Sequence, residues 1–387
     1  MGMEEKQKPN FHDHLIGKDT PLSWSDLPQD LLNSIFERLT FANFQRAKAV
    51  CSSWLASSRQ CVPKKQNHWL ILFPEDNENN YQCTLFNPEE RDKLHRTKDL
   101  GLEFAKSFCI ATYGSWLLMQ YPRCSLYVLN LFTHERINLP SVESQLGTAK
   151  VERTLDGDGN VEFRTTGPDG KVYRGTSIRN PVFWIDERTN DYVVVWGLRD
   201  LCVVYSKKGD TAWTQLPKTS GCVDVVYKES KLYFLSLSGC FFIFDLSGET
   251  PQQIFQCGVI VERLRLGLVV PTKLVVTVTG EVFKAEKWWR SRSKTWTFRV
   301  IKICSPGFLR NHQLVGSLGD ESMLLEQGVT VLSNEGFIRD CIYFSDIREN
   351  TYSIFLFNLK TKKTEPLHNF DRSLAQFSRA RWFLPQT

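Results

Sequence analysis

The sequence lacks the features that mark a secreted, membrane-bound or disulfide-stabilised protein. Its 387 residues contain no apolar stretch near the roughly 20 residues that a membrane span needs, and no apolar run follows the first residues. The 11 cysteines are odd in number and form no Cys-x-x-Cys pair. Buried free thiols of an intracellular protein explain this usage better than a disulfide framework does. We therefore expect a soluble protein of the nucleus and cytoplasm.

Motifs of nucleophilic, zinc-dependent and nucleotide-dependent catalysis are also missing. The sequence has no Gly-x-Ser-x-Gly, no His-Glu-x-x-His and no Gly-x-x-x-x-Gly-Lys-Ser/Thr, and its seven histidines are dispersed. The segment 156–160 (DGDGN) is similar to a calcium loop, but Glu152 and Glu162 are both out of register for the twelfth-position ligand. We expect no catalysis, no cofactor and no metal site in this chain.

Charge gives little indication of a nucleic-acid partner. The net charge of +5 is mild for this length, and the charged and hydrophobic fractions of 24% and 42% are those of an ordinary soluble globule. One segment, KAEKWWRSRSKTW (284–296), combines five Lys or Arg with three Trp, which can mean phosphate contact and base stacking. Because strand-like runs flank it, a β-hairpin with a basic exposed turn is the favoured interpretation.

The most informative stretch lies near the start of the chain, between Leu27 and Trp54. Apolar residues recur there at spacings of one, three and four, which is the pattern of a wide apolar stripe on a helix: Leu31, Leu32, Ile35, Phe36 and Leu39. Pro28 fits the first turn of this helix, and Ser25 or Asp26 can cap it. A second apolar set follows after a break near Thr40, so we expect two or three short helices.

A helical unit of this size cannot be stable alone. Chains below about forty residues rarely bury enough apolar surface to fold independently. Its apolar residues must therefore pack on the rest of the chain or on another protein. Periodicity leaves both interpretations open: an N-terminal cap of the following domain, or a docking module for a partner.

The particular residues resemble an F-box from Trp24 to about Val62, most distinctively in the run AVCSSWL (49–55). The resemblance implies that the helices dock on a Skp-type adaptor, which joins a cullin scaffold in a ubiquitin ligase. The residues expected to bind the adaptor or to hold the helices together are Leu27, Pro28, Leu31, Leu32, Ile35, Leu39, Val50, Cys51 and Trp54. The sequence cannot separate these two roles, because so wide a stripe must serve both surfaces.

The remainder of the chain predicts an all-β domain. From Trp69 onward, short runs rich in Val, Ile, Phe, Tyr and Trp alternate with turn residues. A weak repeat of strand, polar turn and second strand is visible in the segments 125–140, 201–217, 240–255 and 352–367. Such repeats favour an irregular six- or seven-bladed β-propeller. A sandwich or irregular barrel is the alternative, since the kelch and Trp-Asp signatures are absent.

These patterns divide the chain into three parts and one insertion. We expect a disordered leader over residues 1–22, an F-box over 23–62 and a β-propeller-like substrate-recognition domain over 66–387. Residues 146–180 are polar and carry Asp-Gly three times, which is a hairpin signal. They predict either a tolerated surface loop or a hairpin that projects to contact a substrate.

The β-rich part resembles a plant domain of unknown function that often follows F-boxes. The resemblance rests on LYVLNLFTHERINLP (126–140), on SLGDESMLLEQ (317–327), on CIYFSD (341–346) and on the terminal RARWFLP (379–385). It identifies the chain as similar to plant F-box proteins near the KIB branch, which is associated with the turnover of shaggy-like kinases. A non-catalytic substrate receptor of a ubiquitin ligase is thus the expected function. The alternative is a protein- or RNA-binding propeller outside any ligase.

Overall fold

A computed structural model shows the chain as two compact units, residues 1–66 with Thr387 and residues 67–386. The whole of the expected leader (1–22), and all of the calcium-like loop (156–160) except Gly157, lie outside the residues it describes. The described residues are 23–39, 41–61, 69–74, 81–87, 93–122, 124–155, 157, 161–258, 271–291, 293–303, 313–333, 337–348, 351–368 and 377–384.

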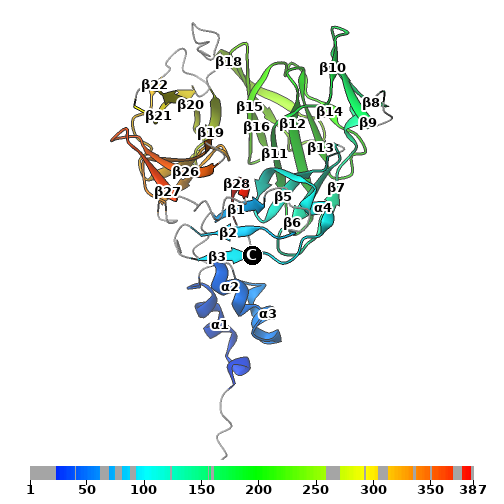
Figure 1. Cartoon of the computed structure of the whole chain (residues 1–387). Helices are drawn as coiled ribbons and strands as arrows, with labels where there is room; N and C mark the ends of the chain where they lie inside the picture. Colours follow the sequence, from blue (N-terminus) through cyan, green and yellow to red (C-terminus); the bar gives the residue numbers. More distant parts are fainter. Residues whose placement is uncertain are drawn as a thin grey trace, which may run out of the picture. The chain divides into compact units, whose positions relative to one another are not determined.

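The first unit holds a short 3-10 helix and three α-helices (Figure 1, blue). They are η1 (Trp24–Asp26), α1 (Gln29–Phe36), α2 (Phe41–Ala47) and α3 (Ser52–Ser58). The expected capping of α1 by Ser25 or Asp26 is wrong, because both residues belong to η1, which Ser23 caps. Pro28 is instead the N-cap of α1, and its carbonyl accepts the amides of Leu31 and Leu32. A proline suits this place because the first amides of a helix have no partner within it.

The second unit consists of mainly antiparallel sheets, and in most of them the strands follow one another in chain order (Figure 1). Three of them have four strands each: β4 (Phe108–Tyr113), β5 (Trp116–Gln120), β6 (Leu126–Asn130) and β7 (Arg136–Asn138); β11 (Ile178–Ile185), β12 (Tyr192–Leu198), β13 (Cys202–Lys207) and β14 (Thr214–Gln215); β15 (Cys222–Lys228), β16 (Lys231–Ser236), β17 (Cys240–Asp245) and β18 (Gln252–Gly258). Two short helices, α4 (Leu102–Ala105) and η2 (Val142–Ser144), lie in the connections.

A nine-stranded sheet combines two further arms, one of four strands and one of five. One arm is β19 (Thr272–Val276), β20 (Val282–Arg290), β21 (Thr295–Ile303) and β22 (Gln313–Leu314). The other arm comprises β23 (Glu321–Leu324), β24 (Val329–Leu332), β25 (Cys341–Arg348), β26 (Thr351–Asn358) and β27 (Thr364–His368). They join where β19 and β24 pair in parallel at Val276 and Val329, while β23 and β25 also run parallel. This pairing makes one of the blades irregular.

The last sheet is built from both ends of the unit. Strand β28 (Phe377–Phe383) pairs with β1 (Trp69–Pro74), which continues to β2 (Thr84–Phe86) and β3 (Leu94–Arg96). This sheet therefore has the order β28-β1-β2-β3, with the last described strand at one edge and the first three strands beside it. The pairing of β28 with β1 closes the sheets into a ring. The innermost strand of each sheet then has a neighbouring sheet on both sides.

Side chains connect these innermost strands around the closed ring. Thr112 of β4 donates its hydroxyl to the carbonyl of Trp382 in β28, 2.6 Å away. Asn180 of β11 donates to the carbonyl of Val223 in β15 at 2.8 Å. Asp224 of β15 accepts the amide of Leu274 in β19 at 2.8 Å. The topology is that of a six-bladed β-propeller, which confirms the predicted all-β domain, and the sandwich and barrel alternatives are wrong.

The four repeated segments occupy one place in their blades. Each forms the third and fourth strands: β6–β7, β13–β14, β17–β18 and β26–β27. In two of them the turn begins with an asparagine, Asn130 or Asn358, whose side-chain oxygen accepts two backbone amides of the turn. Side-chain acceptors of this kind stabilise tight turns. The repeat is thus a repeat of strand pairs.

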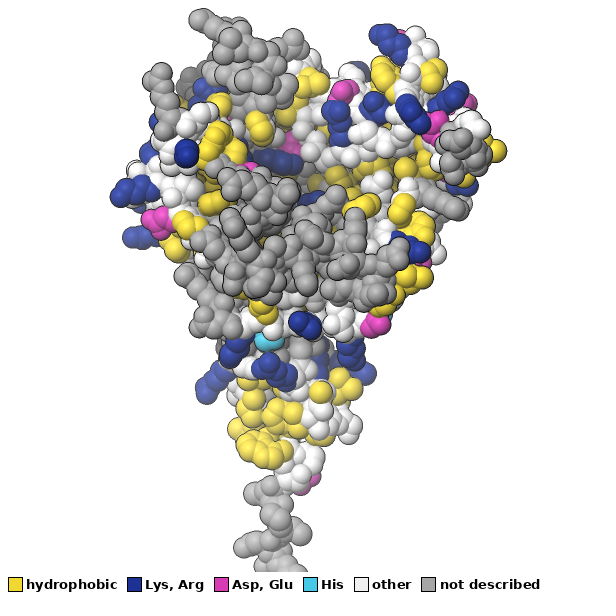
Figure 2. All heavy atoms as spheres, in the orientation of Figure 1, with side chains coloured by type: hydrophobic (Ala, Val, Ile, Leu, Met, Phe, Trp, Pro, Cys, Tyr) yellow, Lys and Arg dark blue, Asp and Glu magenta, His cyan; other side chains and the backbone are white. Residues whose placement is uncertain are grey.

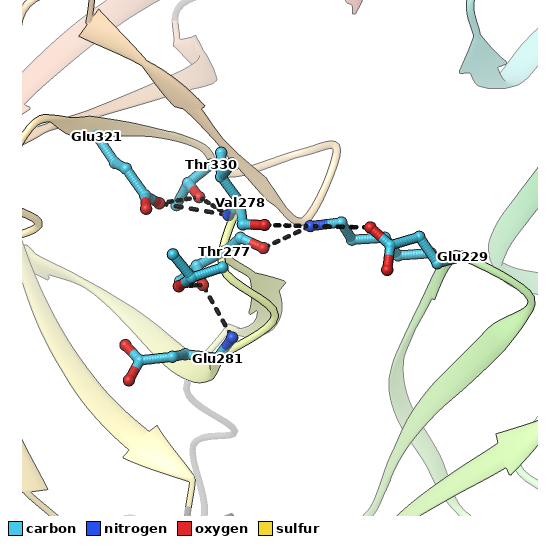
Figure 3. A network of polar contacts seen from close by, with 8 residues as sticks. Glu229, Thr277, Val278, Glu281, Glu321 and Thr330 are labelled. Atoms are coloured by element: carbon cyan, nitrogen blue, oxygen red, sulfur yellow. Dashed lines mark hydrogen bonds and ion pairs between the residues drawn. The ribbon is translucent and has the colours of Figure 1, made fainter.

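The apolar core lies between adjacent blades rather than at one centre. The cluster around Trp116, Trp196 and Trp213 joins the blade of β4 to the blade of β11. Further clusters lie between each following pair of sheets. A polar network also spans three blades (Figure 3): Lys228 of β15 donates to the carbonyl of Thr277, and the amide of Val278 donates to Thr330 of β24 at 2.9 Å. Each blade is therefore stabilised chiefly by its neighbours.

The segment 146–180 forms a small sheet outside the six blades (Figure 1). Strands β8 (Lys150–Leu155), β9 (Val161–Thr166) and β10 (Val172–Arg174) pair antiparallel in the order β10-β9-β8. Asp169 and Gly170 turn the chain between β9 and β10, with Gly170 at φ +75°, a conformation that favours glycine. Strands β9 and β10 thus form a hairpin, β8 adds a third strand, and contact of this sheet with a substrate stays a prediction.

The closing strand generates a test of stability. Trp382 of β28 is only 2% exposed and packs between Phe337 and Tyr343 of the neighbouring blade. We expect Trp382→Ala to lower the free energy of unfolding by about 3–5 kcal/mol, because it removes a large side chain from a closed core. Urea unfolding followed by the β-sheet circular dichroism signal measures this change. Trp24→Ala is the control, since that side chain is 69% exposed and its loss should cost less than about 1 kcal/mol. Equal effects of the two substitutions would contradict the closure argument.

Candidate functional site

The helical unit has a small aromatic core of its own. Phe36 of α1 makes edge-to-face contacts with Phe44 of α2 and Trp54 of α3, with ring centroids 5.4 Å and 5.6 Å apart. Such geometry adds to the gain from burial alone. The buried members of this core are Leu32, Phe36, Phe44, Ala47, Trp54 and Cys61. Each of the three helices therefore contributes to holding the others.

Polar contacts fix the segment before α1 against α3. The indole Nε1 of Trp54 donates to the carbonyl of Trp24 at 2.8 Å, and the hydroxyl of Ser53 donates to the carbonyl of Ser25 at 3.1 Å. At the other end, the thiol of Cys61 donates to the side-chain oxygen of Asn33 at 2.9 Å. These contacts position η1 and both ends of the helical array without using the outer apolar side chains.

Two cysteines of the unit differ in their environments. Desolvation raises the pKa of the Cys61 thiol, and Glu37 raises it further. A hydrogen bond with the Ser53 hydroxyl lowers the pKa of Cys51, whose sulfur lies 3.1 Å from that oxygen. Cys51 is also the N-cap of α3. Both thiols serve the local structure of the helices.

Part of the apolar stripe faces away from this core. Leu31 of α1 is 53% exposed, Val50 before α3 is 54% exposed and Leu55 of α3 is 42% exposed. Pro28 is exposed as well. Hydrophobic side chains cover much of the visible surface of the helical unit (Figure 2). We call Leu31, Val50 and Leu55 the outer apolar set. A side chain in this set has no structural need to be apolar, since its neighbours in sequence already fill the core.

The structure separates the nine predicted site residues into three groups. Leu32 and Trp54 are buried and belong to the core. Leu31, Val50 and Pro28 are exposed and available to a partner. The others are half-buried and pack against the core with one side: Leu27, Ile35, Leu39 and Cys51. The sequence pattern correctly placed these residues in one helical unit. It could not say which of them lie in the core and which on the exposed surface.

The sequence-based selection missed members of both surfaces. Phe36 and Phe44, each 0% exposed, are the centre of the core. Leu55 lies one residue after Trp54 and is exposed, and Trp24 presents a 69% exposed ring before α1. The apolar spacing contained the signal for the two phenylalanines, because they continue the stripe. The helical spacing did not indicate Leu55, because Trp54 is the residue of this turn that the spacing places on the buried face.

The basic and aromatic segment 284–296 forms the β20–β21 hairpin, as predicted, with Trp289 opposite Trp296. Two of its four described cations make contacts within the domain. Lys284 is 1% exposed and pairs with Glu286 at 2.8 Å, while Lys287 donates to the carbonyl of Ser345 at 3.0 Å. Arg290 and Lys294 at the turn are exposed, and Arg292 lies outside the described part of the chain. Two exposed cations make a weak surface for nucleic acid.

Two other kinds of site are absent from the described residues. No group of three or more His, Cys, Asp and Glu within them could hold a metal ion. Among the helices that can be described, none is long and apolar enough to cross a membrane.

The chain matches two families over most of its length. Residues 24–66 match the F-box domain, and residues 85–358 match the KIB1-4 β-propeller. The protein At4g22170 of Arabidopsis thaliana, named as an F-box protein, is 54% identical over 382 residues, which cover 95% of this chain and 98% of that protein. At4g22180 of the same plant, also named as an F-box protein, is 51% identical over 404 residues, or 100% of this chain and 99% of that one.

Solved structures with a similar fold share little sequence with this chain. TolB from Acinetobacter baumannii is 9% identical with a TM-score of 0.41, over 85% of this chain and 70% of that chain. The sequence matches are decisive instead. A helical F-box followed by a β-propeller defines the class, and this chain belongs to the family of plant F-box proteins that carry a KIB1-4 β-propeller.

The division between core and outer surface predicts opposite outcomes for two adjacent leucines. Leu32→Ala should destabilise the helical unit by about 3 kcal/mol, because Leu32 is 1% exposed and its truncation leaves a cavity. Leu31→Ala should change stability by less than about 0.5 kcal/mol, since half of that side chain already meets water. Amide hydrogen exchange of peptides from α1 and α3 measures both. Similar acceleration by the two substitutions would show that Leu31 is also part of the core.

Proposed function

We propose that this protein is the substrate receptor of a ubiquitin ligase built on a Skp-type adaptor and a cullin scaffold. The observation that carries the proposal is the outer apolar set: Leu31, Val50 and Leu55 stay exposed on a unit whose core is complete without them. Apolar side chains that serve no internal packing mark an interaction surface. The F-box match supplies the partner that such a surface fits.

In this proposal the propeller holds a target protein and performs no chemistry. Binding the target next to the ligase raises its local concentration near the ubiquitin-loaded enzyme. Loops at the ends of the blades suit this role, because they can vary while the strands keep the fold. The receptor would act in the nucleus and cytoplasm. A shaggy-like kinase is one candidate target, and resemblance to the KIB branch is its only support.

The adaptor surface can be tested without unfolding the unit. We expect Leu31→Asp and Val50→Asp each to weaken binding to a purified Skp-type adaptor by at least about 30-fold, because each would bury an unpaired carboxylate in the centre of the interface. Both positions are more than half exposed in the free chain, so the helices should stay folded. Isothermal titration calorimetry measures the affinity, and circular dichroism checks the fold.

Ser34→Asp is the matched control for these variants. Ser34 lies on α1 and is exposed, so the substitution adds the same charge to the same helix without removing apolar surface. Its affinity for the adaptor should stay within about threefold of the native value. Failure of the native chain to bind a competent adaptor would contradict the proposal, and the propeller would then act outside a ligase. Equal losses with Ser34→Asp would contradict the role of the apolar set.

A further inference from the structure

The β20–β21 hairpin extends beyond the blade to which it belongs. In three other blades the second strand ends opposite the first residue of the innermost strand: Gln120 pairs with Phe108, Leu198 with Ile178 and Ser236 with Cys222. Strand β19 begins at Thr272, opposite Glu286, whereas β20 and β21 continue to pair as far as Arg290 and Thr295. Beyond Glu286 the hairpin is therefore a two-stranded ribbon of four further residue pairs.

Contacts with the neighbouring blade hold this ribbon in place. Trp289 and Trp296 are cross-strand partners, and their ring centroids are 5.1 Å apart. The ammonium group of Lys287 lies over the rings of Trp296 and Phe344, 4.1 Å and 4.8 Å from their centroids. The same group donates to the carbonyl of Ser345 in β25 at 3.0 Å. An isolated hairpin is marginally stable at best in water, so these contacts give the ribbon its fixed position.

The end of the ribbon carries positive charge that the hairpin itself does not balance. Arg290 and Lys294 are both exposed. The sequence has no acidic residue between Trp288 and Thr297. The cross-strand partner of Arg290 is Thr295, which is neutral. Any carboxylate that compensates these two cations must therefore come from outside the ribbon.

The carboxylates beside the ribbon are paired with other cations. Glu286 is 2% exposed, and its carboxylate lies 2.8 Å from Lys284 and 2.7 Å from Arg299. Asp346 of β25 lies 3.7 Å from Lys287. No described carboxylate forms an ion pair with Arg290 or Lys294. Exposed charges contribute little to folding, so the stability of the hairpin does not account for the two cations at its end.

The aromatic rings of the ribbon indicate which kind of anion fits. Trp289 packs on Trp296, and the guanidinium group of Arg299 lies over Trp288, 5.2 Å from its centroid. All three rings are half-buried and have partners within the domain. Single-stranded nucleic acid is bound through aromatic rings on which bases stack. Arginine instead binds carboxylates through two parallel hydrogen bonds, and lysine offers them a point charge.

We propose that the end of the β20–β21 hairpin binds an acidic segment of the target protein, with carboxylates on Arg290 and Lys294. Charge complementarity identifies this occupant. The fixed position of the ribbon lowers the entropic cost of binding, because no loop has to be ordered. The assignment of the segment to the target rests on the proposed function, whereas the binding itself requires only the propeller unit's own residues.

Fluorescence anisotropy with short labelled peptides tests the binding on the full chain. The probe alternates Glu with Ser, and two comparison peptides alternate Gln or Lys with Ser. We expect the native chain to bind the Glu peptide at least about fivefold more tightly than the Gln peptide, with an affinity that falls as salt is added. Lack of this preference would overturn the inference. Tighter binding of a single-stranded RNA of the same net charge would overturn it as well.

Reversing the charges separates direct contact from general attraction. Arg290→Glu should weaken binding of the Glu peptide by at least about threefold, and Arg290→Glu/Lys294→Glu should make the Lys peptide the tighter ligand. Lys218→Glu is the matched control, since Lys218 is an exposed cation between β14 and β15. Equal weakening by Arg290→Glu and Lys218→Glu would show only attraction by the net charge of the chain, and would overturn the inference.

Amide exchange of peptides from β20 and β21 separates a binding role of Arg290 from a structural one. Exchange should be unchanged in Arg290→Glu, because this side chain is exposed and its cross-strand partner is neutral. Faster exchange together with lost binding would make Arg290 a structural residue and overturn the inference. Arg290→Lys should weaken binding less than Arg290→Glu does, because the charge stays while the planar fork is lost.

The outcome can be read independently of the ligase proposal. Arg290→Glu should bind the Skp-type adaptor as well as the native chain does, because Arg290 belongs to the propeller unit. Loss of adaptor binding by Leu31→Asp should in turn leave peptide binding unchanged. Failure of the native chain to prefer the Glu peptide overturns this inference alone, whereas failure to bind the adaptor overturns the proposed function alone.

Discussion

The pairing of β1 with β28 is the constraint on which the second unit depends. A propeller blade buries its faces only against the blades on either side, so a ring with an open position would leave two apolar faces exposed to water. The chain meets this need by placing its last strand in the same sheet as its first strands. The contacts of Trp382 with the neighbouring blade then connect the final residues to the core. The parallel pairings of β19 with β24 and of β23 with β25 are tolerated because the ring is closed elsewhere.

The helical unit faces the opposite problem, since it has few residues and little interior. Its core takes the large rings of Phe36, Phe44 and Trp54 and leaves Leu31, Val50 and Leu55 outside. A free domain would lose nothing by making these positions polar. Their apolar character is explained by a second surface that a partner covers.

Much of this arrangement could be predicted from local pattern. The apolar stripe and the run AVCSSWL predicted the helical docking module, and alternating strands with polar turns predicted the all-β unit. Flanking strand-like runs placed 284–296 in a hairpin, and the Asp-Gly turn placed β9 next to β10. These features are decided by residues near one another in the chain, where periodicity and turn chemistry act directly. The capping of α1 was mispredicted, because Ser25 and Asp26 fold into a 3-10 helix that local propensity did not reveal.

The sequence by itself determined the two kinds of unit, the strand repeat and the positions that are apolar. Only the tertiary structure decided the number of blades, the closing partner of β1 and the role of each apolar position. The reason is physical: Leu31 and Leu32 are equally hydrophobic, and only the packing of α1 on α2 and α3 makes one 53% exposed and the other 1% exposed. In the same way, Arg164 and Arg174 are ten residues apart in the chain, and strand register alone sets them opposite each other.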